Sequence, residues 1–148
     1  MRHPLELIPL QLRKPMFYVF FALTLVIFGV FRVLDKPLQT SAASSGIVSF
    51  ELARDVDSAQ TIVNSWDVNA RLSAAFGLGF DYLFMPIYAL ALSLGLLLAS
   101  SNKTSWYRPF AAWMGWGAFA AALFDSVENY ALWKELLIFV IRKSENMP

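Results

Sequence analysis

Three long apolar runs, each with at most one charged residue, limit what this chain can fold into. The first, Pro15 to Phe31, and the third, Pro109 to Phe124, carry no charge, and the second, Leu72 to Asn102, carries only Asp81. A helix rises about 1.5 Å per residue, so such runs are long enough to cross a hydrocarbon core of about 30 Å. We therefore predict an all-α, membrane-embedded helical bundle with three transmembrane helices, over about 15–33, 72–99 and 109–132.

Composition agrees with a membrane protein. Of the 148 residues, 57% are hydrophobic and 16% are charged, whereas a soluble domain has about 25% charged residues. We expect one membrane-embedded domain, 1–148, because too little chain remains for a separate soluble core. A net charge of +1 gives no basic field for nucleic acid.

Missing residue types exclude several kinds of chemistry. The chain has no cysteine, and its only histidine is His3. These absences remove disulfides, thiol nucleophiles, Cys/His zinc sites and a histidine pair for haem. We expect His3 to be solvated or at the level of the lipid headgroups.

Two features modify the first two spans. A cleaved signal peptide is the alternative to the first span, with Thr40–Ser44 as its small-residue site, but the run is longer than usual for such a peptide. Asp67 can cap the second helix. Pro86 should kink that helix and leave the Tyr82 carbonyl without its helical partner.

The segment 34–71 is the main extramembrane part. Its first half is expected to be loop, with the stretch GIVSFEL (46–52) as a short extended piece. From Asp55 onward, apolar residues recur at helical spacing, which predicts an amphipathic surface helix. That helix could lie on the membrane or dock a partner. Its apolar residues are Val56, Ala59, Ile62, Val63 and Trp66.

Basic residues predict the orientation. Arg2, Arg13 and Lys14 precede the first span, and Lys103 and Arg108 lie between the second and third. By the positive-inside rule the N-terminus is cytoplasmic and segment 34–71 lies on the opposite side. After the third span, the apolar stretch Leu136–Ile141 is too short to cross, so it is expected to be a surface helix or an incomplete element.

Polar residues inside the spans are the candidate site. Asp81 and Asp125 are expected at similar depth, near Arg32 and Arg71, and Asp125, Glu128 and Asn129 share one helix face by their spacing. Small residues on the same face would aim the acids between helices. The predicted cluster is Arg32, Arg71, Asp81, Asp125, Glu128 and Asn129.

Three interpretations of this cluster stay open. It could be a structural network in which arginine neutralises the aspartates, or a cation or proton site with one raised pKa, or a group already in headgroup water. No nucleophile with a base, metal-ligand spacing or phosphate loop occurs, so we expect no enzyme and no catalytic or metal-binding residue. No cofactor is expected either. Aromatic residues of the first span could contact lipid, pigment or quinone, and are more often plain lipid-facing surface.

Three stretches carry a resemblance: FELARDVDSAQTIVNSWD, AAFGLGFDYLFMPIYA and ALFDSVENYAL. They resemble a family of small bacterial and cyanobacterial integral membrane proteins without an assigned activity, over roughly 48–132. The resemblance implies a compact bundle in a bacterial inner membrane or thylakoid-type membrane, usually with another hydrophobic helix after the EN pair. Here the tail would be a reduced version, or a partner would supply the missing surface.

Together these features favour an accessory or structural subunit of a larger membrane protein complex, with other integral membrane subunits as partners. The alternative is a small channel-, carrier- or receptor-like protein that binds a cation, proton or lipophilic ligand at the carboxylates.

Overall fold

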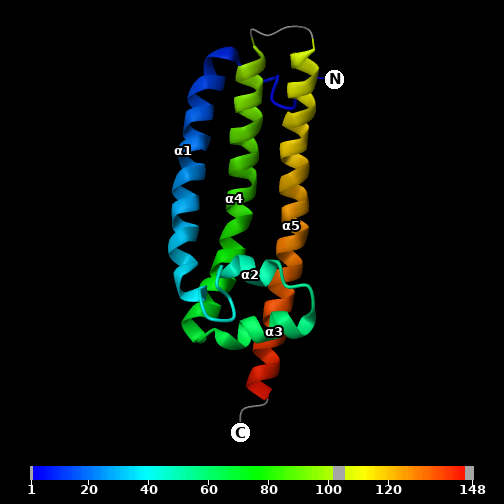
Figure 1. Ribbon diagram of the computed structural model, residues 1–148. Coiled ribbons are helices and arrows are strands. Elements are labelled where there is room, and N and C mark those ends of the chain that lie inside the picture. The colour runs from blue at the N-terminus through cyan, green and yellow to red at the C-terminus, as the bar shows by residue number, and fades with distance from the viewer. Residues whose placement is uncertain (1, 102–105, 146–148) are drawn as a thin grey trace. The chain divides into compact units, whose positions relative to one another are not determined.

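The computed structural model describes residues 2–101 and 106–145, the last four of these by their backbone alone. All regular structure in these residues is helical, as predicted (Figure 1). Lys103, which contributes to the predicted orientation, lies outside the described residues. The elements are α1 (Leu10–Leu34), η1 (Lys36–Leu38), α2 (Ile47–Glu51), α3 (Val56–Ser65), α4 (Val68–Ser100) and α5 (Tyr107–Glu145).

Three helices are long and apolar enough to cross a membrane, which indicates an integral membrane protein. The candidate spans are Leu10–Leu38, Val68–Ser100 and Tyr107–Ile141. Each span begins before its predicted start and ends after its predicted end, because the helix extends beyond the apolar run into the polar and charged residues on both sides. Pro86 lies inside α4, and the helix continues through it.

The chain divides into two compact units. Unit 1 comprises Met1–Phe28 and Tyr82–Val127, and unit 2 comprises Gly29–Asp81 and Glu128–Pro148. Each unit is described separately below.

Small residues dominate the buried part of unit 1. Where α4 and α5 belong to this unit, most of their buried positions are alanine or serine, and such small residues let helix backbones approach closely. α1 packs against α4 through Phe17, whose ring would lie 3.1 Å from a Cβ placed at Gly95. The buried residues of α4 and α5 in unit 1 include Ala89, Ala91, Leu94, Leu97, Ala111, Ala112 and Ala118.

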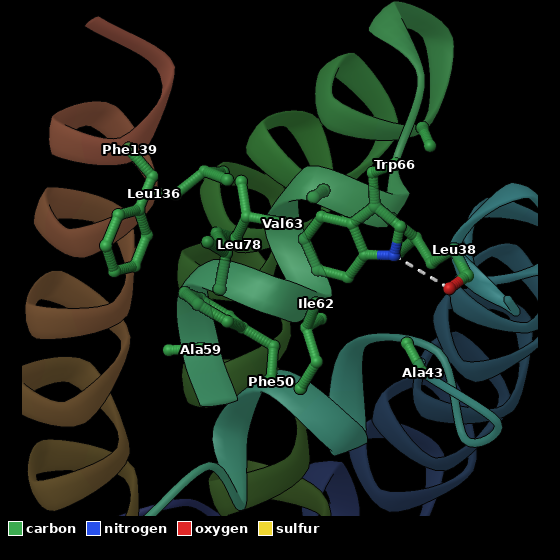
Figure 2. Close-up of a cluster of buried hydrophobic side chains, with 12 residues drawn as sticks. Leu38, Ala43, Phe50, Ala59, Ile62, Val63, Trp66, Leu78, Leu136 and Phe139 are labelled. Atoms are coloured by element: carbon green, nitrogen blue, oxygen red, sulfur yellow. Dashed lines mark hydrogen bonds between the residues drawn. The ribbon is translucent and has the colours of Figure 1, made fainter. Parts of the chain in front are cut away.

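Unit 2 is organised around a larger hydrophobic core (Figure 2). Trp66 lies fully buried in it, with its ring edge against Phe50, and its indole Nε1 donates a 2.8 Å hydrogen bond to the Leu38 carbonyl. This bond satisfies the only polar atom of a large apolar side chain. The core comprises Leu38, Ala43, Phe50, Ala59, Ile62, Val63, Trp66, Ala70, Ala74, Leu78, Leu136 and Phe139.

The amphipathic helix is confirmed as α3. Asp55 caps it by accepting from the Ser58 amide at 2.7 Å. Its apolar face packs into the core of unit 2, so residues of this chain cover it and that face needs neither lipid nor a partner. Val56 is the exception among the five predicted apolar residues, because its side chain is exposed.

The predicted extended piece at 46–52 is wrong, because Ile47–Glu51 form helix α2. The Asp35 carboxylate accepts from the Ile47 amide at 2.8 Å and so supplies the cap that the sequence hides. Gly46 precedes the helix with φ of 58°, a conformation that glycine adopts without strain. The cap comes from a residue far along the chain, and local pattern does not reveal it.

The predicted separate tail is also wrong. α5 runs without a break from Tyr107 to Glu145. Leu136 and Phe139 lie three residues apart on one face of this helix and are both buried in the core of unit 2. The stretch Leu136–Ile141 therefore completes a core of this chain.

Candidate polar site

Carboxylates gather around Glu51 in unit 2. Glu51 ends α2, and the charges of Asp81 on α4, Glu128 on α5 and Asp35 all act on it. Desolvation by the surrounding protein raises the pKa of the Glu51 carboxyl above its usual range, and these three neighbours raise it further. Two of them, Asp81 and Glu128, are residues that the sequence singled out, whereas Glu51 itself was missed.

Asp35 has a structural task in this group. One carboxylate oxygen accepts from the Ile47 amide, and the other accepts from the Gln39 side-chain amide at 3.1 Å. Its negative charge at the first turn of α2 also suits the positive end of the helix.

Asn129 is the one buried member of the predicted trio on α5. It is only 4% exposed, and its Nδ2 donates a 2.5 Å hydrogen bond to the Leu78 carbonyl of α4. A helical carbonyl has a second lone pair, so it can accept this bond and keep its helical one. Asp125 and Glu128, the two acids of this trio, are both exposed.

The two arginines differ in environment. Arg71 is half-buried, and its Nε donates to the Val63 carbonyl at 3.2 Å, near the end of α3. Its Nη2 is buried, and no described residue is its hydrogen-bond partner. Arg32 is exposed in the last turn of α1, where a cation suits the carbonyl end of a helix. Neutralisation of Asp81 and Asp125 by these arginines stays a prediction, as does the similar depth of the two aspartates.

In unit 1, two tyrosines of α4 bind α5. The Tyr88 hydroxyl donates to the Asp125 carboxylate, and the Tyr82 hydroxyl donates to the Ser126 carbonyl at 3.1 Å. Asp125 therefore has a neutral donor as its partner. The sequence offered a signal for both tyrosines, since a hydroxyl in an apolar helix needs a partner.

His3 is not solvated, which corrects the expectation from the sequence. His3 is only 8% exposed in unit 1, and its Nε2 is buried with no hydrogen-bond partner among the residues that the structure describes. Its position near the N-terminus suggested a surface location. Contacts with helices far along the chain bury it instead.

In the described ranges 2–101 and 106–145, no three His, Asp or Glu side chains are placed to hold a metal ion. No protein-family model, curated protein or solved structure matches the chain.

Proposed function

We propose that this protein is an accessory or structural subunit of a larger membrane protein complex, with no catalysis of its own. The observation that carries the proposal is the exposure of α1. In the apolar window of this span only 6% of the residues are buried in the chain's own fold. Association of helices in lipid relies on close packing, so a helix with so little internal packing has a large surface available to another subunit.

The outer face of α1 in unit 1 suits such a contact. Tyr18, Ala22, Leu25 and Val26 recur at helical spacing and are all exposed. Ala22 has a small side chain between larger neighbours on this face, so a second helix can approach closely there. The C-terminal stretch gives no support to the proposal, because Leu136 and Phe139 are already covered.

Extraction from native membranes tests the proposal. We expect native mass spectrometry in mild detergent to detect the chain in a complex with other membrane proteins. We expect Ala22→Trp to reduce the recovered complex at least tenfold, because the large indole would prevent a second helix from approaching this position. Ser41→Trp is the matched control, since Ser41 is exposed outside the spans.

Two results oppose the subunit proposal. One is recovery of the wild-type chain solely as a free monomer under conditions that preserve other complexes. The other is equal recovery of complex from wild type and from Ala22→Trp, with both variants folded by circular dichroism.

A second candidate is a carrier- or receptor-like protein that binds a proton or cation at the carboxylates. The raised pKa of Glu51 beside Asp81 and Glu128 favours it, because like charges held together bind a proton or cation more tightly. Glu51→Gln and Asp81→Asn would then abolish proton flux or cation binding in liposomes. Unchanged flux together with altered thermal stability would leave the carboxylates a structural role.

A further inference from the structure

His3 belongs to neither polar group described above, yet the fold makes room for it. A Cβ at Gly115 of α5 would overlap the imidazole ring, so a larger residue fits there only if the ring moves. Two positions further along α5, a Cβ at Gly117 would meet nothing within 4 Å. The imidazole ring therefore packs directly against Gly115 of unit 1.

Hydrogen bonds hold the residues on both sides of His3 against α5 and α1. The Trp116 indole of α5 donates to the Arg2 carbonyl at 3.2 Å. Arg13 of α1 donates to the Glu6 carbonyl at 2.7 Å and to the Ile8 carbonyl at 2.8 Å. Residues 2–9 are thus held to α5 at one end and to α1 at the other, with His3 buried between these attachments.

The imidazole occupies this place in its neutral form. Nδ1 accepts a 3.2 Å hydrogen bond from the Leu5 amide, which requires that Nδ1 carry no proton and that Nε2 carry one. Protonation would put a second proton on Nδ1, facing the amide hydrogen of Leu5. It would also place a positive charge in a buried site.

We propose that residues 2–9 form a protonation-controlled latch, which neutral His3 holds against α4 and α5 and which protonated His3 releases. Release uncovers Gly115 and Ser93, both buried in the closed state. The Ser93 hydroxyl oxygen is buried as well, with no hydrogen-bond partner in the described part of the chain. Acidification therefore exposes the surface of unit 1 at Gly115 and Ser93.

The charges around the ring agree with this direction. Burial lowers the pKa of His3 and Arg13 of α1 lowers it further, whereas Glu6 of its own segment and the Ser93 backbone of α4 raise it. Gly115, its neighbour on α5, does not titrate. The net result is a pKa below the usual value of about 6.5.

The pH window follows from this sign. The latch is fully closed above about pH 6.5, where His3 is neutral in both states. Below that value His3 of the released segment binds a proton more readily than docked His3 does. Each further unit of pH decrease therefore lowers the docking equilibrium constant by up to tenfold, until the pKa of the docked ring is reached.

A single histidine makes the latch measurable. With ¹³C-labelled histidine and the full chain in nanodiscs, the ring signals of His3 report its pKa directly. We expect the wild-type ring to titrate below about pH 6.5, and Gly115→Ala to restore the usual value by displacing the ring. Gly117→Ala is the matched control and should titrate like wild type.

Hydrogen exchange provides a second measurement if Gly115→Ala does not fold. We compare residues 2–9 at about pH 7.5 and about pH 5.5, each normalised to the same residues as a free peptide. Wild type should lose protection at the lower pH, and His3→Gln should show equal protection at both, since an amide does not titrate. A usual pKa in wild type, or pH-independent protection of its segment, would overturn the latch.

Discussion

Two side chains in unit 2 each form a hydrogen bond that joins two elements. Trp66 links the end of α3 to the Leu38 carbonyl after α1, and Asn129 links α5 to the Leu78 carbonyl of α4. Both side chains are buried, so neither carbonyl can exchange its partner for water at low cost.

Trp66→Phe tests the first of these bonds. The substitution keeps an aromatic ring in the core but leaves the Leu38 carbonyl without the indole donor. We expect a loss of about 1–3 kcal/mol in the free energy of unfolding, since the buried acceptor is no longer satisfied. Trp106→Phe is the control, because Trp106 is exposed. Equal losses in the two variants, measured by chemical unfolding in detergent micelles, would contradict this role of the bond.

Glu51 gives a pH-dependent prediction. A carboxyl group whose pKa rises on folding binds more protons in the folded state, so stability falls as pH rises from the unfolded pKa through the folded one. Glu51→Gln removes this penalty. We expect it to stabilise the protein near pH 7, by less than about 1 kcal/mol, because part of the residue remains open to solvent and water screens the repulsion.

The advantage of Glu51→Gln should disappear below about pH 4.5, where the wild-type carboxyl is protonated in both states. Thermal unfolding at the two pH values measures the difference. A variant less stable than wild type at pH 7 would show that the Glu51 carboxylate makes a favourable interaction that outweighs the repulsion.

At the scale of elements, the helices that follow from local pattern were predictable and those that depend on distant caps were not. Asp55 and Asp67 stand directly before α3 and α4 and cap them, the latter by accepting from the Ala70 amide at 2.7 Å. Helix α2 has no such signal, because Asp35, which caps it, lies twelve residues before Ile47. Sequence spacing cannot show that a loop will fold back that far.

Gly46→Ala tests how α2 begins. Gly46 has φ of 58°, and a Cβ there would overlap the Asp35 carboxylate. We expect a loss of about 1–3 kcal/mol in stability from backbone strain and from the displaced cap. Gly79→Ala is the control in α4, since its Cβ would meet nothing within 4 Å and alanine favours a helix by about 1 kcal/mol.

Thermal unfolding in detergent, followed by circular dichroism, should rank the stabilities as Gly79→Ala, wild type and Gly46→Ala, from highest to lowest. A Gly46→Ala protein as stable as wild type would mean that α2 does not need this glycine.

At the scale of the whole molecule, hydrophobicity predicts the membrane-crossing helices, and tertiary packing decides what lies beyond them. The three apolar runs were sufficient to predict three spanning helices. They could not show that the third helix would continue beyond its predicted end at Leu132 through WKELLIF, because charged residues interrupt the apolar pattern there. The candidate site was predictable in part: Asp81 and Glu128 both act on Glu51, but Tyr88 and His3 acquire their roles only through contacts between distant elements.

The C-terminal part of α5 provides the test of that packing. Leu136 is 2% exposed in the core of unit 2, whereas Ile138 on the same helix is 50% exposed. Leu136→Ala should lower the free energy of unfolding by about 2–5 kcal/mol, because it removes buried methyl groups and leaves a cavity. Ile138→Ala removes a similar volume from an exposed position and should cost less than about 1 kcal/mol. Both variants are compared with wild type in the same purified, partner-free preparation. If they lose equal stability there, Leu136 does not pack into a core of its own chain, and the C-terminal stretch would again be a surface for a partner.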